Sequence, residues 1–406
     1  MPEVVVLCPQ NRDLHEIRAA GLEESFGVSC AGADLDAIDQ PFDPALFVAE
    51  QSAFPWDGVV GTKDRSALLA AVIAERLGLS GPSPRALLNC QHKPTSRLLQ
   101  RRAVPAAVPG FALLDGSAEA MPFPPPFFVK PVVGRLSENA RRVETLDELR
   151  ALREDGYPER YSAIAELVGL PPADVHGFLA EELLEGEEVT LEGYSYRGRV
   201  VTIGVTDSAK YPGTNSFERF EYPSRLGPER VAELTGIAER VIPVLGFDDG
   251  FFNVELFVPE RGPASLIEVN GRIASQFAPL VRALHGRSTY EALFRLACGD
   301  DPGWTSELPE GVAISYCLRT FQDAYVERTP EPDDGLEVLV RPGRWLSEQG
   351  TNDAQSYRLA IFYEAGETRE EALARCQARA RSLDFELVPT ATAVPGSAPR
   401  SLRRSA

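Results

Sequence analysis

The segment 250–284 reads GFFNVELFVPERGPASLIEVNGRIASQFAPLVRAL and contains the pattern that decides the fold. Apolar residues recur at every second position over 252–258, which is the period of a β-strand with one polar face. A second short strand is expected over 266–270, and the Pro and Gly residues between the two predict an antiparallel hairpin with a tight loop. If this hairpin is symmetric about its turn, Glu255 lies directly opposite Glu268.

Two opposed carboxylates are unfavourable in a strand pair unless something positive lies between them. Directly paired residues have Cβ atoms about 5 Å apart, and like charges there destabilise the pair by about 0.2 to 1 kcal/mol at an exposed site. Asn270 follows Glu268 by two residues and therefore shares its side of the strand. Carboxylate and amide oxygens suit Mg²⁺, so Glu255, Glu268 and Asn270 are predicted metal ligands. The alternatives are a solvated strand face, or ion pairs of the glutamates with an arginine such as Arg272.

Composition limits the class of protein. A chain of 406 residues is expected to hold two or three domains. The net charge of −19 argues against nucleic-acid binding through a general basic field. The first residues lack a basic leader, and no run of about 18 apolar residues occurs, so a cytoplasmic protein without a membrane partner is expected. Six cysteines without CxxC spacing and four dispersed histidines favour buried reduced thiols over disulfides or a zinc site.

The order of strand and helix patterns indicates the architecture. Strands and helices alternate over 3–90, which predicts a small open α/β sheet. The first strand is followed by CPQNRD instead of GxGxxG, so dinucleotide binding is not expected. The aromatic and basic segment 210–226 is expected to be a loop, and strands with one capped helix are expected over 311–388. The tail from Pro389 is rich in Pro, Ser, Ala and Arg and is expected to be disordered.

Two lysines and one acidic segment occupy positions suited to a nucleotide. Lys93 precedes a helix pattern over 94–102, although alone it is most simply a surface lysine. Lys130 ends a short strand beside a proline that fixes the exit of the chain, which suits a phosphate partner. The segment EELLEGEE at 181–188 offers carboxylates for a diol, and is equally compatible with a solvated acidic turn.

Taken in this order, Lys93, Lys130, EELLEGEE, Glu255 and the run EVNGR at 268–272 resemble the motifs of the ATP-grasp superfamily. The resemblance covers 1–388 and implies an α/β fold, α+β in the ATP-grasp core, with an N-terminal open α/β domain and ATP-grasp central and C-terminal domains. The divisions that it implies are an N-terminal domain at 1–91, a lid subdomain at 92–180, a core with the metal site at 181–303, a C-terminal subdomain at 304–388 and a tail at 389–406.

The resemblance implies how ATP is bound. Lys93 and Lys130 contact its phosphates, and Glu188 binds the ribose hydroxyls. The main chain that reads the adenine edge is that of Glu181, Glu182, Leu183 and Leu184. The glycine-rich phosphate flap of the family corresponds here to GRLSENA, which has a single glycine, so Ser137 or Arg135 is expected to replace its main-chain contacts.

The resemblance also implies a metal and a catalytic role. Glu255, Glu268 and Asn270 hold Mg²⁺ or Mn²⁺, two ions in the family, on the ATP phosphates. Arg272 is the expected catalytic residue, because the family's arginine contacts the transferred phosphate or the substrate. Gly271 stands where the family frequently has Pro or Thr, which is a small departure.

The activity implied is that of a carboxylate-amine ligase similar to the L-amino acid (dipeptide) ligases, with a biotin-carboxylase-like architecture. ATP phosphorylates a carboxylate, expected to be that of an amino acid, and an amine attacks the acyl phosphate to form an amide. Lys210, Arg219 and Arg225 are candidate contacts for the carboxylate, and a plain surface loop is the alternative. Both partners are small molecules, and a homodimer is compatible with this reading. The rival functions are a biotin- or purine-type carboxylase and a non-catalytic nucleotide-binding protein.

Overall fold

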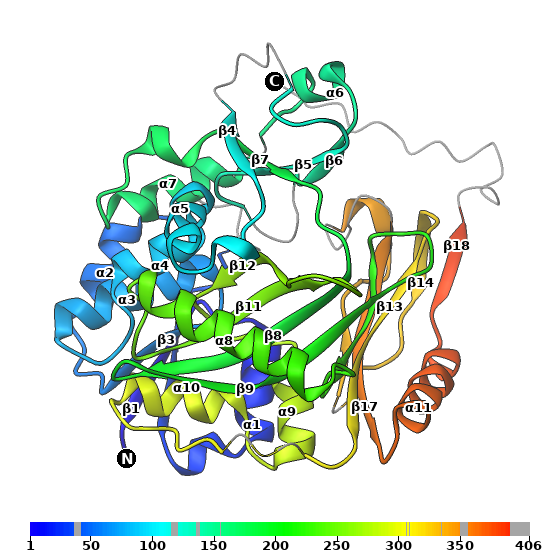
Figure 1. Ribbon diagram of the computed structural model, residues 1–406. Coiled ribbons are helices and arrows are strands. Elements are labelled where there is room, and N and C mark those ends of the chain that lie inside the picture. The colour runs from blue at the N-terminus through cyan, green and yellow to red at the C-terminus, as the bar shows by residue number, and fades with distance from the viewer. Residues whose placement is uncertain are drawn as a thin grey trace, which may run out of the picture. The chain divides into compact units, whose positions relative to one another are not determined.

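The computed structural model describes residues 1–35, 42–114, 121–134, 139–154, 156–305, 307, 309–333, 335–349 and 356–389. The chain divides into two compact units, whose elements are labelled in Figure 1. The first consists of Met1–Ser208 and Glu221–Glu310, and the second of Ala209–Phe220 with the described part of Gly311–Ala406. The finer division into four domains and a tail stays a prediction.

The first unit begins with a three-stranded parallel sheet in the order β2-β1-β3. Its strands are β1 (Glu3–Leu7), β2 (Gly27–Ala31) and β3 (Gly58–Gly61). The helices of this region are α1 (Asn11–Ala19), α2 (Pro44–Gln51), α3 (Asp64–Leu77), α4 (Pro84–Gln91) and α5 (Lys93–Ala103), with a 3-10 turn at Leu22–Glu24. The three valines of β1 are fully buried, as expected for the central strand of a parallel sheet. The predicted open α/β sheet is confirmed.

A small antiparallel sheet follows in the same unit, in the order β4-β7-β5-β6. Its strands are β4 (Phe111–Leu114), β5 (Phe127–Pro131), β6 (Arg141–Val143) and β7 (Phe178–Glu182). The accompanying helices are α6 (Leu146–Arg150) and α7 (Tyr157–Glu166), with 3-10 turns at Pro105–Ala107 and Pro172–Val175. A separate hydrophobic cluster that includes Phe127, Val129 and Val143 holds this sheet together. We call it the lid sheet.

The largest sheet of the first unit has the order β12-β11-β8-β9. Its strands are β8 (Glu187–Tyr196), β9 (Arg199–Lys210), β11 (Gly250–Val258) and β12 (Ser265–Asn270), and its helices are α8 (Pro228–Val244), α9 (Ala278–His285) and α10 (Thr289–Ala297). Apolar residues of β8, β11 and β12 join the main hydrophobic core, which also includes residues of α3, α4 and α8. The metal hairpin, defined here as β11, β12 and their connecting turn, is therefore fixed on a rigid base.

The register of the metal hairpin confirms the predicted opposition of Glu255 and Glu268, which are direct partners. The symmetric register is wrong closer to the turn, where a β-bulge shifts the pairing by one residue and Leu256 pairs with Leu266. Ile267 is the extra residue of this bulge. Ile267 lies on the edge strand of its sheet, and its carbonyl accepts from Arg97 and Lys130.

The second unit contains two sheets. The first has the order β10-β13-β17-β15 and the second the order β16-β14-β18. The strands are β10 (Phe217–Tyr222), β13 (Val312–Thr320), β14 (Ala324–Arg328), β15 (Leu336–Val338), β16 (Arg344–Trp345), β17 (Tyr357–Gly366) and β18 (Glu386–Pro389). They are accompanied by α11 (Arg369–Ser382) and a 3-10 turn at Leu346–Glu348. The strands and helix expected over 311–388 are confirmed, but the expected loop 210–226 is corrected, because its FERFEY segment is strand β10.

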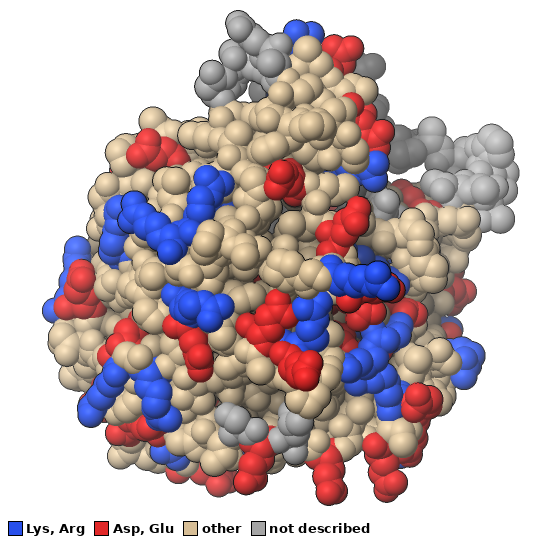
Figure 2. Space-filling model, in the orientation of Figure 1, with Lys and Arg blue, Asp and Glu red and all other residues tan. Residues whose placement is uncertain are grey.

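The surface and the cysteines agree with the compositional reading. On the face shown in Figure 2, Lys and Arg side chains lie among Asp and Glu side chains. All six cysteines are free. None of the helices in the described part of the chain is long and apolar enough to cross a membrane. The expected tail lies, from residue 390 onward, outside the described residues.

Candidate active site

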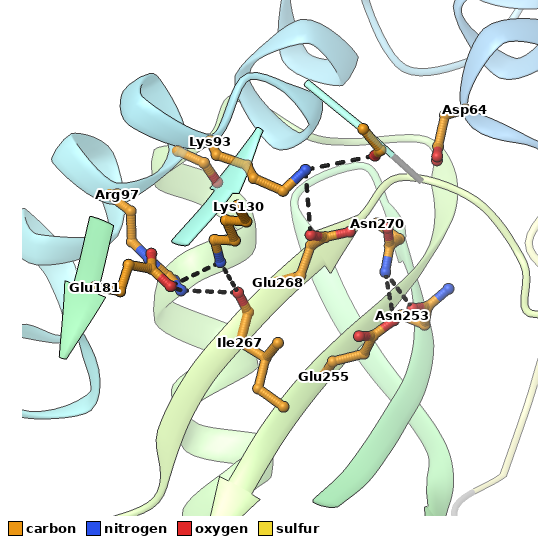
Figure 3. A network of polar contacts seen from close by, with 12 residues as sticks. Asp64, Lys93, Arg97, Lys130, Glu181, Asn253, Glu255, Ile267, Glu268 and Asn270 are labelled. Carbon is orange, nitrogen blue, oxygen red and sulfur yellow. Dashed lines mark hydrogen bonds and ion pairs between the residues drawn. The ribbon is translucent and has the colours of Figure 1, made fainter. Parts of the chain in front are cut away.

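The metal hairpin presents two carboxylates and an amide at one place (Figure 3). The Asn270 side chain donates its amide N–H groups to Glu255 Oε1 at 3.0 Å and to Asn253 Oδ1 at 2.9 Å. Both donor positions of the amide are thereby used, and its oxygen accepts from Arg272 Nη2 at 3.5 Å and keeps a second lone pair for a cation. Burial and then the neighbouring Glu268 charge raise the pKa of Glu255, so this carboxyl tends to hold a proton when no cation is bound.

Glu268 has the opposite electrostatic environment. Lys93 Nζ lies 3.6 Å from Glu268 Oε2, and it also donates to the carbonyl of Gly134 at 3.4 Å. Burial acts to raise the pKa of Glu268, but Lys93, Lys130 and Arg272 outweigh it and lower that pKa. The pKa values of the two opposed glutamates are therefore shifted in opposite directions, which lessens their repulsion.

The donor set fits a hard divalent cation. Two opposed carboxylates and one amide oxygen are the groups that Mg²⁺ or Mn²⁺ prefers. Within the described ranges, His, Cys, Asp and Glu side chains form no group of three that could hold a metal. A cation at this site would therefore take its remaining ligands from phosphate oxygens and water, as Mg²⁺ commonly does in nucleotide-dependent enzymes.

A buried charge network joins the lid sheet to the metal hairpin (Figure 3). Glu181 on β7 accepts from Arg97 Nε at 2.5 Å, and Lys130 Nζ on β5 lies 2.8 Å from its other oxygen. Arg97 and Lys130 also donate to the carbonyl of Ile267, at 2.8 and 3.2 Å. Burial acts to raise the pKa of Glu181, but the two cations outweigh it and hold that pKa low. Glu181 is therefore a charged anchor between two cations.

The sequence reading did not identify Arg97, and it assigned Glu181 only through its main chain. Glu181 pairs with Phe111 and Phe128 on the two sides of β7, and its side chain is what points into the network. A sequence signal for Arg97 existed, because it follows Lys93 by four residues on α5 and so shares a helix face with it. The adenine-binding role of 181–184 stays a prediction.

We expect Arg97→Met to lower the free energy of unfolding by about 3 kcal/mol, because it removes one partner of a buried ion pair and leaves the charge of Glu181 half compensated. Urea titration measures this loss. Arg102→Met is the matched control, since Arg102 lies exposed on the same helix and its replacement should change stability by less than about 0.5 kcal/mol. A loss below about 1 kcal/mol for Arg97→Met would contradict the anchoring role.

Arg272 forms an ion pair with Asp64, and its charge also acts on Glu255 and Glu268, so the alternative of a counter-ion to these glutamates stays open. Its Nε donates to Asp64 Oδ1 at 2.6 Å, and its Nη1 donates to the carbonyl of Ile273 at 3.3 Å. Asp64 begins α3, and the sequence reading missed it. Burial acts to lower the pKa of Arg272, but Asp64 outweighs it, so the guanidinium stays charged. Its Nη2 lies 3.5 Å from Asn270 Oδ1, beside the metal ligands.

The other candidate residues are less closely tied to this site. Glu188 is half-buried at the start of β8, opposite Phe257 of β11. Arg225 pairs with Asp207, Nε to Oδ2 at 3.1 Å. Lys210 and Arg219 belong to the second unit, where Arg219 pairs with Glu218. Their roles as substrate contacts stay predictions.

The remaining candidates are the residues expected to bind adenine and those expected to replace the phosphate flap. Glu182 ends β7 and donates its main-chain N–H to the carbonyl of Gly110 at 3.0 Å. Leu183 and Leu184 follow in the connection to β8 and lie outside both strands. Ser137 and Arg135 lie outside the described residues.

Residues 123–279 match the family model of the ATP-grasp domain. A relative, the uncharacterized protein y4rH of Sinorhizobium fredii (strain NBRC 101917 / NGR234), is 26% identical over 354 residues, which are 83% of this chain and 70% of the relative. This relative adds no functional name.

Solved structures show the same fold over nearly the whole chain. An L-amino acid ligase from Bacillus licheniformis is similar with a TM-score of 0.74 and 18% identity, covering 95% of this chain and 98% of that one. A phosphoribosylglycinamide synthetase from Anaerococcus prevotii has a TM-score of 0.67 and 14% identity, covering 95% and 99%. A biotin carboxylase from Campylobacter jejuni has a TM-score of 0.66 and 15% identity, covering 95% and 92%. The predicted α/β fold with an ATP-grasp core is confirmed.

Proposed function

The chain contains an ATP-grasp domain at 123–279, and on this premise we propose that it is an ATP-dependent carboxylate-amine ligase that joins an amino acid to an amine. The observation that carries the proposal is a convergence of unlike groups at the metal hairpin. Residues from α5, the lid sheet and the hairpin meet there, namely Lys93, Lys130, Glu255, Glu268, Asn270 and Arg272. Such a combination of cationic side chains and oxygen ligands for a metal suits a polyphosphate. A hydrophobic core would not need it, because burial of charged groups is unfavourable.

The two buried lysines supply positive charge for the phosphates of ATP. Lys93 and Lys130 are 8% and 6% exposed, and they form ion pairs with Glu268 and Glu181. A phosphate that approaches them finds ammonium groups that are already desolvated and held by strand and helix. Such preorganised charges stabilise developing negative charge more strongly than flexible surface lysines do.

Glu255, Glu268 and Asn270 would hold Mg²⁺ or Mn²⁺, which when bound would offset the charge of the phosphates and fix their orientation. The number of ions is part of the proposal, and two are expected from the family resemblance. Arg272 has a planar fork of donors beside these ligands, and Asp64 keeps its Nε side fixed. The remaining N–H groups of the guanidinium are suited to phosphate oxygens.

The proposed reaction has two steps, and the chain positions the reactants in both. A carboxylate oxygen of the acid forms a bond to the γ-phosphorus of ATP while the bond to the ADP oxygen breaks, which gives an acyl phosphate. The amine nitrogen then forms a bond to the acyl carbon, phosphate leaves with the electron pair of the broken C–O bond, and the nitrogen loses a proton to water. Positioning and electrostatic stabilisation carry catalysis of this type.

The similarity to a structure named L-amino acid ligase supports an amino acid as the acid substrate, and small-molecule substrates fit a net negative protein. The test is to incubate the protein with ATP, Mg²⁺ and pools of amino acids and to measure ADP and phosphate. A ligase releases both only when acid and amine are present together. Turnover that depends on bicarbonate would replace the proposal by a carboxylase, and ATP binding without any turnover would replace it by a non-catalytic nucleotide-binding protein.

A further inference from the structure

A row of three buried polar side chains crosses the sheet and includes the predicted metal ligand Asn270. Glu192 on β8, Asn253 on β11 and Asn270 on β12 are direct neighbours in the register of three adjacent strands. Paired residues of neighbouring strands point to the same face of the sheet, so the three side chains form one line across it. Their exposed fractions are 2%, 2% and 3%. Burial of polar groups is unfavourable unless each is hydrogen-bonded, so the bonds of this row need a reason.

The bonds of Asn253 reach both a metal ligand and the segment that carries Arg272. Its Oδ1 accepts from Asn270 Nδ2 at 2.9 Å, and its Nδ2 donates to the main-chain carbonyl of Arg272 at 3.0 Å. A flipped Asn270 amide would place its oxygen against the oxygens of Asn253 and Glu255, which is repulsive. Asn253 therefore selects the amide orientation in which the Asn270 oxygen points away from the row.

Glu192 makes a second contact to the same segment. Its Oε1 accepts the main-chain N–H of Ala274 at 3.2 Å. The carbonyl of Arg272 and the N–H of Ala274 are thus held by side chains from two neighbouring strands, on either side of Ile273. Asn253 and Glu192 thus hold the main chain around Arg272, while Asp64 holds its guanidinium group.

We propose that Asn253, supported by Glu192, is a positioning residue of this site: it turns the Asn270 oxygen toward the divalent cation and fixes the main chain of Arg272. This inference rests on the proposed function, because it assumes that a cation is held at the hairpin. Asn253 touches neither the cation nor the substrate, and it acts only through Asn270 and Arg272. An asparagine is required because the position needs one acceptor and one donor at the same time.

Two variants separate the two contacts. Asn253→Leu has a similar volume and removes both bonds. Asn253→Asp keeps an acceptor for Asn270 but loses the donor to the Arg272 carbonyl. Ser195→Ala is the control, because Ser195 is a buried residue of β8 that bonds Asp248 at 2.6 Å and pairs with Gly250, outside the row. It removes a buried hydrogen bond from the same sheet without touching Asn270 or Arg272.

The first measurement is Mn²⁺ binding in the presence of ATP, followed through the electron paramagnetic resonance signal of free Mn²⁺. We expect Asn253→Leu to weaken Mn²⁺ binding by about 10 to 100-fold, as loss of a ligand's supporting partner typically does. Ser195→Ala should bind Mn²⁺ as the wild type does. Folded Asn253→Leu protein that binds Mn²⁺ within about twofold of the wild type would overturn the inference, whereas a wild type that binds no Mn²⁺ with ATP would overturn the proposed function itself.

The second measurement covers the case in which Asn253→Leu does not fold. We expect Asn253→Asp to lower kcat by about tenfold while KM for ATP stays within about twofold, because the acceptor for Asn270 is kept, whereas the donor to the Arg272 carbonyl is replaced by a carboxylate oxygen that repels it. If Asn253 were merely structural, its replacement would change stability without lowering kcat at an unchanged KM for ATP. Unchanged kcat in a folded Asn253→Asp protein would overturn the positioning of Arg272.

Discussion

Glu255→Gln and Glu268→Gln should each lower ATP turnover by more than about 100-fold while the protein stays folded. Each changes a carboxylate of the proposed metal site to an amide, and loss of a ligand costs more than the roughly 10 to 100-fold lost when a supporting residue is changed. Glutamine keeps the size of glutamate. At position 255 it also keeps the oxygen that accepts from Asn270, so the hairpin itself is not disturbed.

Stability should move in the opposite direction to activity. Glu255 lies directly opposite Glu268, and its raised pKa shows that the metal-free protein already favours a neutral group there. Glu255→Gln makes that neutral state permanent and removes any remaining repulsion, which for opposed like charges amounts to about 0.2 to 1 kcal/mol. We therefore expect an unchanged or slightly higher free energy of unfolding in the absence of metal.

Steady-state ADP release and urea unfolding, measured on the same preparations, test both expectations. Glu260→Gln is the control, because Glu260 is exposed in the turn of the same hairpin and far from the opposed pair in the register. It should keep wild-type turnover. If Glu255→Gln or Glu268→Gln kept turnover within about twofold of the wild type, the metal site would not lie at this hairpin.

The opposed glutamates were predictable because strand periodicity is local. Alternation along β11 and β12 assigns each side chain to a face, and a short turn limits the register to few possibilities. The pairing of Glu255 with Glu268 followed from this pattern. The bulge at Ile267 did not, because one extra residue in a strand leaves the apolar pattern nearly unchanged, and nothing in that pattern indicates that the Ile267 carbonyl accepts from Lys130 and Arg97.

The side chains that bind the site residues could not be predicted from the sequence, for a different reason. Asp64 binds Arg272 across 208 positions of the chain, and Arg97 binds Glu181 across 84. No pattern in a single sequence connects residues so far apart. The lysines and EVNGR could be placed only through their resemblance to a family, which supplies the motif residues and not the side chains that hold them.

Strand β10 was missed because its composition resembles that of a loop. FERFEY has its aromatic residues at Phe217, Phe220 and Tyr222, so apolar and charged residues do not alternate with the period of two of a strand. The segment also follows Pro, Gly, Thr, Asn and Ser, which are typical of turns. Neither the period nor the polarity of these residues therefore predicts a strand.

Arg272→Lys should lower kcat by about 100-fold or more with little change in KM for ATP, if Arg272 contacts the phosphate in the transition state. The Nε of Arg272 is used by Asp64 at 2.6 Å, and other nitrogens of the guanidinium face Ile273 and Asn270. A guanidinium serves several acceptors at fixed angles, whereas lysine has a single nitrogen at the end of a flexible chain. Lysine at 272 can neutralise Asp64 or reach a phosphate. Its single ammonium nitrogen cannot hold both groups at fixed angles.

A purely structural arginine would behave differently, and the chain contains one for comparison. Arg282 on α9 binds both oxygens of buried Glu16, at 3.0 and 3.2 Å, away from the metal hairpin residues. Arg282→Lys should lower the midpoint of urea unfolding and leave kcat within about twofold of the wild type. If Arg272→Lys gave this same result, or if it weakened ATP binding and turnover in equal proportion, Arg272 would be a structural partner of Asp64 or a ground-state contact, because only an interaction made in the transition state lowers kcat alone.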